Sequence, residues 1–174
     1  MKKRHLNSLE VSSIGYGCMG LSMGYGSAPD KDEAIRLIQK AYDLGCTFFD
    51  TAEFYGNGAN EELLGEALRE IRDKVVISTK FWMRKKAEEI PVGGLMQEIR
   101  NHLEGSLKRL GTDHVELYTQ ARVNKDIPVE EFAWCMAEFI KEGKILGWGQ
   151  SQATEEEVRR GHQRQGQNQP LGRR

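Results

Sequence analysis

Residues 48–56 read FFDTAEFYG, and this stretch decides how the whole chain is interpreted. Two phenylalanines lead into the carboxylate of Asp50, and Tyr55 follows five residues later, next to Gly56. A short apolar run that ends in polar residues and a glycine is typical of a buried strand and the loop after it. The stretch therefore predicts a strand that ends in an acid and a loop that carries a phenol.

A second apolar run, downstream of the first, ends in a lysine. Residues 75–79 read VVIST, and Lys80 follows them. Side chains alternate between the two faces of a strand, so Asp50 and Lys80 can lie on one face of neighbouring strands. The carboxyl ends of parallel strands are where α/β folds place their chemistry. We expect Asp50, Lys80 and Tyr55 to meet there, although the acid and the lysine alone would equally suit a structural ion pair.

The rest of the chain predicts alternating strands and helices. Strands are expected at 46–50, 75–80, 115–120 and 144–149, and helices at about 31–44, 60–71, 95–110 and 128–142 and from about 155 onward. Residues 3–6 and 9–14 predict a hairpin that turns at Asn7 and Ser8. Five strand-helix units with short connections predict an α/β fold with a parallel sheet.

Residues 15–20 read GYGCMG and match the G-x-G-x-x-G spelling of a dinucleotide-binding turn. In a doubly wound nucleotide fold a helix starts at this turn, because the pyrophosphate meets the helix N-terminus. Here a loop follows, and the next helix is expected only near Lys31. A short-chain oxidoreductase of that fold also needs its tyrosine and lysine on one helix, whereas Tyr55 and Lys80 are too far apart. Both observations disfavour a doubly wound fold.

Composition limits the class of protein. A chain of 174 residues is long enough for one domain with a core, and its net charge of -1 gives no reason to expect nucleic acid or an anionic membrane as a partner. No run approaches the roughly 20 apolar residues of a membrane span. The three cysteines are widely spaced and lie in apolar company, which favours free thiols in a reducing compartment over disulfides or a metal site. We expect a cytoplasmic protein.

Five motifs, taken together and in order, resemble the aldo-keto reductase family. They are residues 14–20, 49–56, 76–80, 116–120 and 143–151, and the resemblance extends over about residues 3–158. It implies a (β/α)8 TIM barrel closed at the bottom by an amino-terminal β-hairpin. It also implies reversible hydride transfer between NADPH and an aldehyde or ketone, with no metal. Because the chain holds only about five β/α units, the resemblance implies an incomplete barrel.

The resemblance also implies roles for individual residues. Hydride delivered to a carbonyl carbon leaves charge on the oxygen, so a proton must be donated there. Tyr55 would be the acid, Lys80 would stabilise its phenolate as a nearby cation, and Asp50 would anchor Lys80. The implied cofactor-binding residues are Gly17, Cys18, Met19, Asp50 and Ser151, and the implied substrate pocket consists of Tyr25, Trp82, Gln120 and Ala121.

Two features depart from the family pattern. The family has a histidine after the glutamine that ends the fourth strand, and this chain has Ala121, whose methyl group cannot polarise a carbonyl. A full barrel needs about 250 residues. We expect residues 1–160 to form a truncated barrel and residues 161–174, which lack apolar alternation, to form a disordered polar tail.

The sequence therefore predicts an NADPH-dependent aldo-keto reductase of weak or no activity in this truncated chain, acting on a small carbonyl substrate that the sequence does not name. The alternative is a pseudoenzyme or interaction subunit built on a partial barrel. Open barrel edges predict self-association in either case, because unpaired strands offer free hydrogen-bonding groups.

Overall fold

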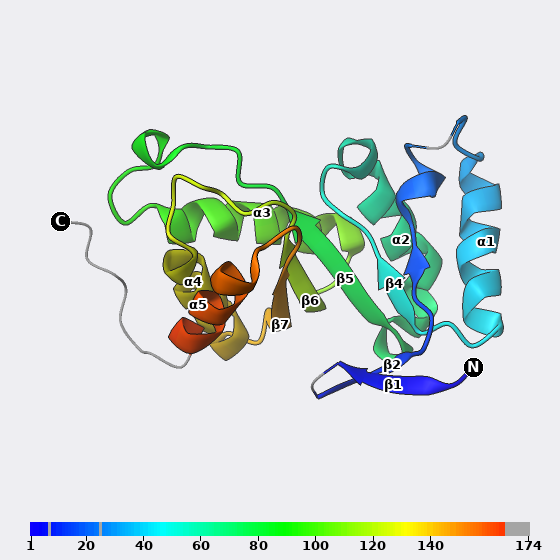
Figure 1. Cartoon of the computed structure of the whole chain (residues 1–174). Coiled ribbons are helices and arrows are strands. Elements are labelled where there is room, and N and C mark those ends of the chain that lie inside the picture. Colours follow the sequence, from blue (N-terminus) through cyan, green and yellow to red (C-terminus); the bar gives the residue numbers. More distant parts are fainter. Residues whose placement is uncertain (7, 25, 166–174) are drawn as a thin grey trace.

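A five-stranded parallel sheet forms the frame of the molecule (Figure 1). The computed structural model describes residues 1–6, 8–24 and 26–165. The sheet strands pair in chain order and are β3 (Tyr16–Gly17), β4 (Phe48–Asp50), β5 (Val76–Phe81), β6 (Val115–Gln120) and β7 (Ile145–Gln150). The helices that alternate with them are α1 (Lys31–Asp43), α2 (Ala59–Leu68), α3 (Leu95–Leu110), α4 (Val129–Lys141) and α5 (Glu155–Gln165). The predicted alternation of strands and helices is confirmed.

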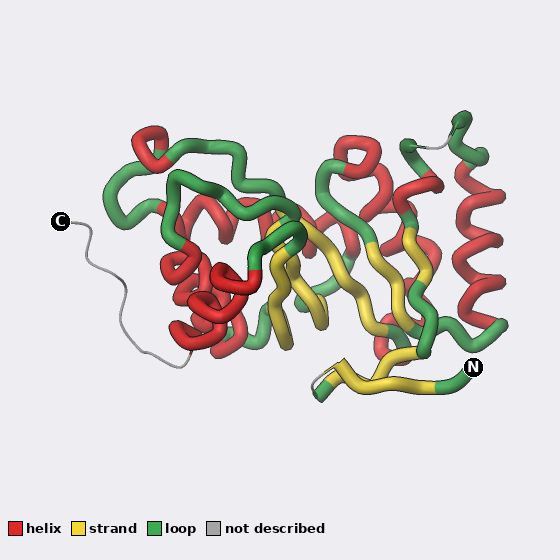
Figure 2. The backbone as a smooth tube through the Cα atoms, viewed as in Figure 1, coloured by secondary structure: helices red, strands yellow, loops and turns green. Residues whose placement is uncertain are grey.

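The five α-helices lie on one side of the sheet, and the core fills the space between the two layers (Figure 2). Right-handed crossovers between parallel strands place successive helices on the same side. Most of the strand side chains that face the helices are buried, and the largest of the fully buried ones are Phe49, Ile77, Phe81 and Tyr118. The rings of Phe81 and Tyr118 stack with their centroids 4.9 Å apart. This helix-facing layer holds the sheet in place.

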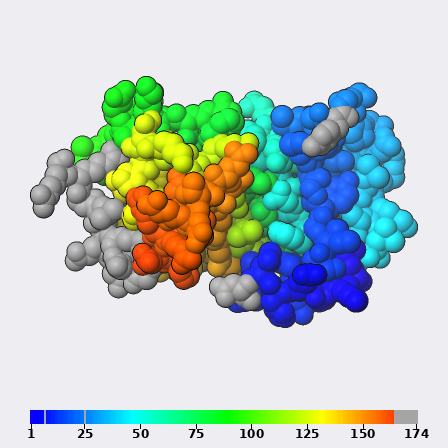
Figure 3. Space-filling model, in the orientation of Figure 1, coloured from blue at the N-terminus to red at the C-terminus, as the bar shows by residue number. Residues whose placement is uncertain are grey.

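The opposite face of the sheet carries the polar residues of the predicted site. The register pairs Asp50 with Ser78 and Lys80 with Thr119, so these four side chains share that face. Figure 3 looks onto this side, where strands from the middle of the chain reach the surface between the amino-terminal and carboxy-terminal segments. Among the described residues, β3 and β7 each pair with one strand only, so the sheet is open at both edges.

A two-stranded antiparallel hairpin, β1 (Lys3–Leu6) and β2 (Leu9–Ser12), crosses the amino-terminal end of the sheet (Figure 1). Hydrogen bonds of Ser12 attach it there. The Ser12 amide donates to the Thr47 hydroxyl at 3.1 Å, and the Thr47 amide donates to the Ser12 hydroxyl at 2.9 Å. The hairpin predicted from the sequence is confirmed, and it leaves the carboxyl ends of the strands free for the site.

Local side-chain signals explain where two of the helices start. The Asp30 carboxylate accepts from the Glu33 amide at 2.8 Å at the start of α1. At the start of α5, the Thr154 hydroxyl accepts from the Glu157 amide at 3.3 Å, and the Glu157 carboxylate accepts from the Thr154 amide at 2.7 Å. Each arrangement satisfies backbone donors that the helix itself leaves unpaired.

The structure differs from the expectations in three places. The first sheet strand is Tyr16–Gly17, which lies inside the glycine-rich segment expected to be only a turn, and a short 3-10 helix, Met19–Leu21, follows it. Helix α2 ends at Leu68 and gives way to a 3-10 segment, Arg69–Lys74. Helix α5 continues through Gln165, so residues 161–165 are helical where a disordered tail was expected. Residues 166–174 of that expected tail lie outside the described residues.

Candidate active site

Asp50 and Lys80 form an ion pair at the carboxyl ends of β4 and β5. The Lys80 ammonium donates to Asp50 Oδ1 and, at 2.8 Å, to the Thr51 carbonyl. The Ser78 hydroxyl donates to the second carboxylate oxygen of Asp50 at 2.9 Å. The Lys80 side chain is 16% exposed and that of Asp50 is 36% exposed, so the pair is reachable from the open face of the sheet. The predicted meeting of these two residues is present in the structure.

Tyr55 completes the arrangement from the loop after β4. Its hydroxyl oxygen lies 3.5 Å from Lys80 Nζ, and Lys80 Nζ lies 5.2 Å from the centre of its ring. The chain turns sharply after it, because Gly56, Asn57 and Gly58 all adopt positive φ angles of 55°, 53° and 96°. Three consecutive residues with positive φ reverse the direction of the chain just before α2 begins. The turn therefore places the phenol against the lysine.

Backbone hydrogen bonding joins the strand of Asp50 to the predicted cofactor turn. The Cys18 amide donates to the Asp50 carbonyl at 2.8 Å, as a continuation of the pairing of Gly17 with Asp50. The Cys18 thiol is buried, and burial together with the nearby Asp50 charge raises its pKa to about 12. Cys18 thus contributes its backbone to the turn, while its side chain belongs to the core. Met19 opens the 3-10 helix that follows.

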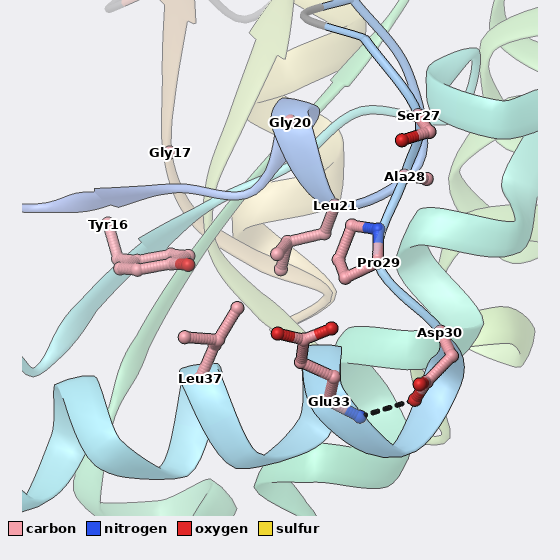
Figure 4. Close-up of a pocket in the computed structure, with 10 residues that line it drawn as sticks. All are labelled: Tyr16, Gly17, Gly20, Leu21, Ser27, Ala28, Pro29, Asp30, Glu33 and Leu37. Carbon is pink, nitrogen blue, oxygen red and sulfur yellow. Dashed lines mark hydrogen bonds between the residues drawn. The ribbon is translucent and has the colours of Figure 1, made fainter.

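A cavity of about 650 Å³ lies beside this turn, between β3, the Met19–Leu21 helix and α1 (Figure 4). Gly17 and Gly20 border it from the turn, and the side chains of Tyr16 and Leu37 extend toward it. The Glu33 carboxylate also points into the cavity in Figure 4. The predicted cofactor turn therefore borders open space on the side that faces α1.

Trp82 follows β5 and covers the side of the Tyr55 loop. Its ring meets the edge of Phe54 at a centroid distance of 5.7 Å, and Phe54 in turn meets Tyr55 at 5.1 Å. The guanidinium of Arg84 lies over the Trp82 ring at 4.1 Å, and that of Arg122 lies 6.0 Å from the ring centre. Phe54 therefore links the indole to the phenol, and the place of Trp82 in a substrate pocket stays a prediction.

The remaining predicted site residues are Gln120, Ala121, Ser151 and Tyr25, and they do not share one location. Gln120 is fully buried, and the register pairs it with Phe81 on the helix-facing side of the sheet, opposite to Thr119 and Lys80. Ala121 is also buried, and its amide donates to the Phe81 carbonyl at 2.9 Å. Ser151 follows β7, and its amide donates to the Gln120 carbonyl at 2.9 Å. Tyr25 lies outside the described residues.

Sequence reasoning missed several buried polar residues around the site. Asn60 and Glu61 begin α2, and both are fully buried. Glu61 accepts from the Thr79 hydroxyl at 2.5 Å and from Arg109 Nε at 2.7 Å. Glu53 accepts from the Trp82 amide at 2.8 Å, and its other oxygen lies 2.8 Å from Nδ1 of His102. In the sequence, only the two neighbouring polar residues at the start of the predicted helix, Asn60 and Glu61, pointed to this network. Their burial could not be predicted, because most of their hydrogen-bond partners come from distant segments of the chain.

Among residues 1–6, 8–24 and 26–165, no three histidine, cysteine, aspartate or glutamate side chains gather closely enough to hold a metal ion. Within the same residues, every helix is too short or too polar to cross a bilayer.

Comparison with known proteins agrees with this fold. The model of the aldo/keto reductase family matches residues 13–167. A probable aldo-keto reductase of Glycine max is 38% identical over 155 residues, which are 88% of this chain and 45% of the soybean protein. Among solved structures, an aldo-keto reductase from Bacillus halodurans in its holo form is 30% identical with a TM-score of 0.80, over 95% of this chain and 55% of that one.

A second solved structure extends the likeness. An aldo/keto reductase from Klebsiella pneumoniae, in complex with NADP and acetate, is 30% identical with a TM-score of 0.72, over 87% of this chain and 49% of that one. The chain spans about half the length of these relatives. Its open sheet, helices and hairpin form part of the TIM barrel implied by the sequence resemblance. On the match over residues 13–167, the chain belongs to the aldo/keto reductase family.

Proposed function

We propose that this chain carries the proton-donating part of a site that reduces an aldehyde or ketone to the alcohol with NADPH. One observation carries the proposal, namely that the Lys80 ammonium lies between the Asp50 carboxylate and the Tyr55 hydroxyl. Membership of the aldo/keto reductase family supports it, as does the relative from Klebsiella pneumoniae that was solved with NADP.

Each of the three side chains has a distinct task in this proposal. Tyr55 donates a proton to the carbonyl oxygen, where negative charge develops during reduction. Lys80 stabilises the resulting phenolate with its positive charge. Asp50 holds the ammonium in place, and the Thr51 carbonyl fixes a second N–H of the same group. NADPH, when bound, supplies the hydride that reaches the carbonyl carbon.

The residues around the pair fit a flat cofactor ring on the open face of the sheet. A Cβ added at Gly17, which pairs with Asp50, would meet nothing within 4 Å. Gly149 pairs with Thr119, and a Cβ there would come within 3.1 Å of the Thr119 hydroxyl. The absence of side chains at both positions leaves backbone that a ligand can approach closely. We propose that Gly17, the Cys18 and Met19 backbone, Asp50 and Ser151 hold the cofactor.

The proposed substrate pocket is narrower than the one expected from the sequence. Trp82 and Ala121 remain in it, whereas the fully buried Gln120 lies on the helix-facing side and is left out. Since Ala121 offers only a methyl group where the family has a histidine, Tyr55 is left as the hydrogen-bond donor for the carbonyl oxygen. This predicts slower reduction than in a relative that keeps the histidine.

The test is NADPH oxidation with a panel of aldehydes, followed at 340 nm. We expect slow turnover that falls about a hundredfold or more in Tyr55→Phe, the usual loss when a general acid is removed. Tyr118→Phe is the matched control, because it removes a phenolic hydroxyl that is fully buried in the core. Equal rates for the wild-type chain and Tyr55→Phe would contradict acid catalysis by Tyr55.

A second candidate function is that of a noncatalytic interaction subunit. The open edges of the described sheet at β3 and β7 and the methyl group at Ala121 favour it. In that case the chain self-associates through its edges, and NADPH fluorescence is unchanged up to millimolar cofactor. Sedimentation velocity and a cofactor titration on the same sample separate the two functions, because a monomer that quenches NADPH fluorescence contradicts the second one.

The three free cysteines, all buried, suit a reducing compartment such as the cytoplasm.

A further inference from the structure

A fully buried asparagine connects the two halves of the proposed site. Asn60 lies at the start of α2, and the exposed fraction of its surface is 0%. Its Nδ2 donates to the Cys18 carbonyl at 2.9 Å and to the Ser22 hydroxyl at 2.7 Å. Its Oδ1 accepts from the Thr51 hydroxyl at 2.6 Å. Both N–H groups and the carbonyl of the amide are thus used.

The partners of Asn60 are the segments that carry the proposed chemistry. Cys18 lies in the turn assigned to the cofactor, and Ser22 follows the Met19–Leu21 helix after it. Thr51 follows Asp50 and supplies the carbonyl that accepts from Lys80. Ser22 also packs against the Tyr55 loop, because a Cβ at Gly56 would come within 2.9 Å of the Ser22 Cβ. One side chain from α2 therefore ties the cofactor turn to the acid-lysine strand and, through Ser22, to the tyrosine loop.

We propose that Asn60 is a positioning residue that holds the cofactor turn in register with the Asp50–Lys80 pair, so that NADPH and the Tyr55 proton meet at one carbonyl. This inference rests on the proposed function. A buried amide whose donors and acceptor are all satisfied fixes its neighbours in one arrangement. Removal of the amide donor leaves the Cys18 carbonyl with only the Leu21 amide, which donates to it at 2.9 Å, and so removes the hydrogen bond that joins the turn to α2. Asn60 acts through the turn and the strand and does not touch the substrate.

Asn60→Asp separates this role from general stability. The aspartate keeps the size of the side chain and the acceptor for Thr51. When ionised, it places a carboxylate oxygen against the Cys18 carbonyl, where the amide donated. When protonated, its O–H can donate there again, and burial favours that neutral form. The cofactor affinity of this variant should therefore depend on pH in a way that the wild-type affinity does not.

The control is Glu61→Gln. Glu61 is the neighbouring residue on α2 and is equally buried, and its hydrogen bonds go to Thr79 and Arg109 instead of the cofactor turn. This variant tests whether any substitution between an acid and its amide at the start of α2 has the same effect.

Two measurements on the chain of 174 residues decide the matter. In hydrogen-deuterium exchange without cofactor, Asn60→Asp should speed exchange of the amides of residues 18–23 at about pH 8, and Glu61→Gln should not. In NADPH fluorescence titrations, the Kd of Asn60→Asp should rise about tenfold at about pH 8 and return toward the wild-type value at about pH 6.

The outcomes distinguish this inference from the proposed function. If the wild-type chain fails to bind NADPH, the proposed function fails, and the exchange measurement still decides whether Asn60 holds the turn. If exchange at residues 18–23 is the same in Asn60→Asp and the wild type, or if both α2 variants change it equally, the positioning role is overturned. A raised Kd that does not recover at lower pH overturns it as well.

Discussion

The Lys80 ammonium donates to the Tyr55 hydroxyl at 3.5 Å and to the Asp50 carboxylate at the same time. The lysine belongs to β5, whereas the tyrosine begins the 3-10 turn Tyr55–Gly58 that leads into α2. The ion pair alone would be a structural feature of the sheet. Its contact with a phenol on a loop is the feature on which the proposed proton transfer depends.

Lys80→Met should separate the structural and catalytic parts of this arrangement. We expect the free energy of unfolding to fall by about 1–2 kcal/mol, because Asp50 loses its partner in a partly exposed setting. The double variant Asp50→Asn with Lys80→Met should recover much of that stability, since no unpaired carboxylate remains. Carbonyl reduction should stay at least about a hundredfold below wild type in both variants. Thermal melts and NADPH oxidation check the two parts, and a double variant that regains activity would contradict the role of Lys80.

Gly65 should be intolerant of a side chain. A Cβ built there would lie 2.4 Å from the Leu110 carbonyl oxygen, so α2 and the end of α3 would have to separate. We expect Gly65→Ala to lower the free energy of unfolding by about 1–3 kcal/mol, as overpacking does. Gly105→Ala in α3 is the control, because its Cβ would meet only the flexible end of Arg109 at 3.1 Å. Urea unfolding should give a larger free energy of unfolding for Gly105→Ala than for Gly65→Ala, and the reverse order would contradict the prediction.

Cys18 and Cys135 should resist alkylation until the protein unfolds. Burial is the main cause that raises the pKa of each thiol from an ordinary value of 9.0 to about 12. The folded state therefore keeps protons that the unfolded state loses, and these thiols make the protein less stable as the pH rises from about 9 toward about 12. Mass spectrometry after iodoacetamide treatment at about pH 8 should show modification of both cysteines in urea and little without it. Rapid modification of either cysteine in the folded protein would contradict the prediction.

The start of α5 should loosen in acid. Hydrogen bonds from the Lys125 side chain and from the amide and hydroxyl of Thr154 lower the pKa of Glu157 from 4.5 to about 2. A lowered pKa in the folded state means that this stabilisation is present above about pH 4.5 and is lost as the pH falls through about 2. Hydrogen exchange in α5 should therefore rise over this interval in the wild type. Glu157→Gln lacks the titrating group and should respond less, and an equal response would assign the loosening to other carboxylates.

The sequence predicted most of the fold because its signals are local. The bounds of α3 match the expected residues 95–110, since an apolar periodicity and a terminal glycine, Gly111, define both ends. β3 was missed as a strand. Two residues of a glycine-rich segment carry no alternation, and only pairing with Phe49 and Asp50 makes them part of the sheet.

The candidate site was predictable to the extent that strand alternation and strand ends place side chains. Asp50 and Lys80 were placed on one face by that rule, and the structure brings them together. Gln120 was expected in the substrate pocket but lies buried on the helix-facing side of the sheet. Whether it borders the pocket depends on which face of β6 turns toward the helices. That choice follows from its register with Phe81.

The sequence by itself determined the order of strands and helices, the hairpin and the identity of the acid, the lysine and the phenol, because each rests on residues close together in the chain. Tertiary structure alone decided the distance at which Lys80 meets Tyr55, a meeting that the sequence predicted, and the three hydrogen bonds of Asn60. The partners in these contacts are 9 to 42 residues apart in the chain. They meet only when the sheet and α2 pack, because burial then requires every polar atom of Asn60 to find a partner. The five motifs, the stretch 48–56 among them, therefore indicated the family, and packing placed the tyrosine of that stretch.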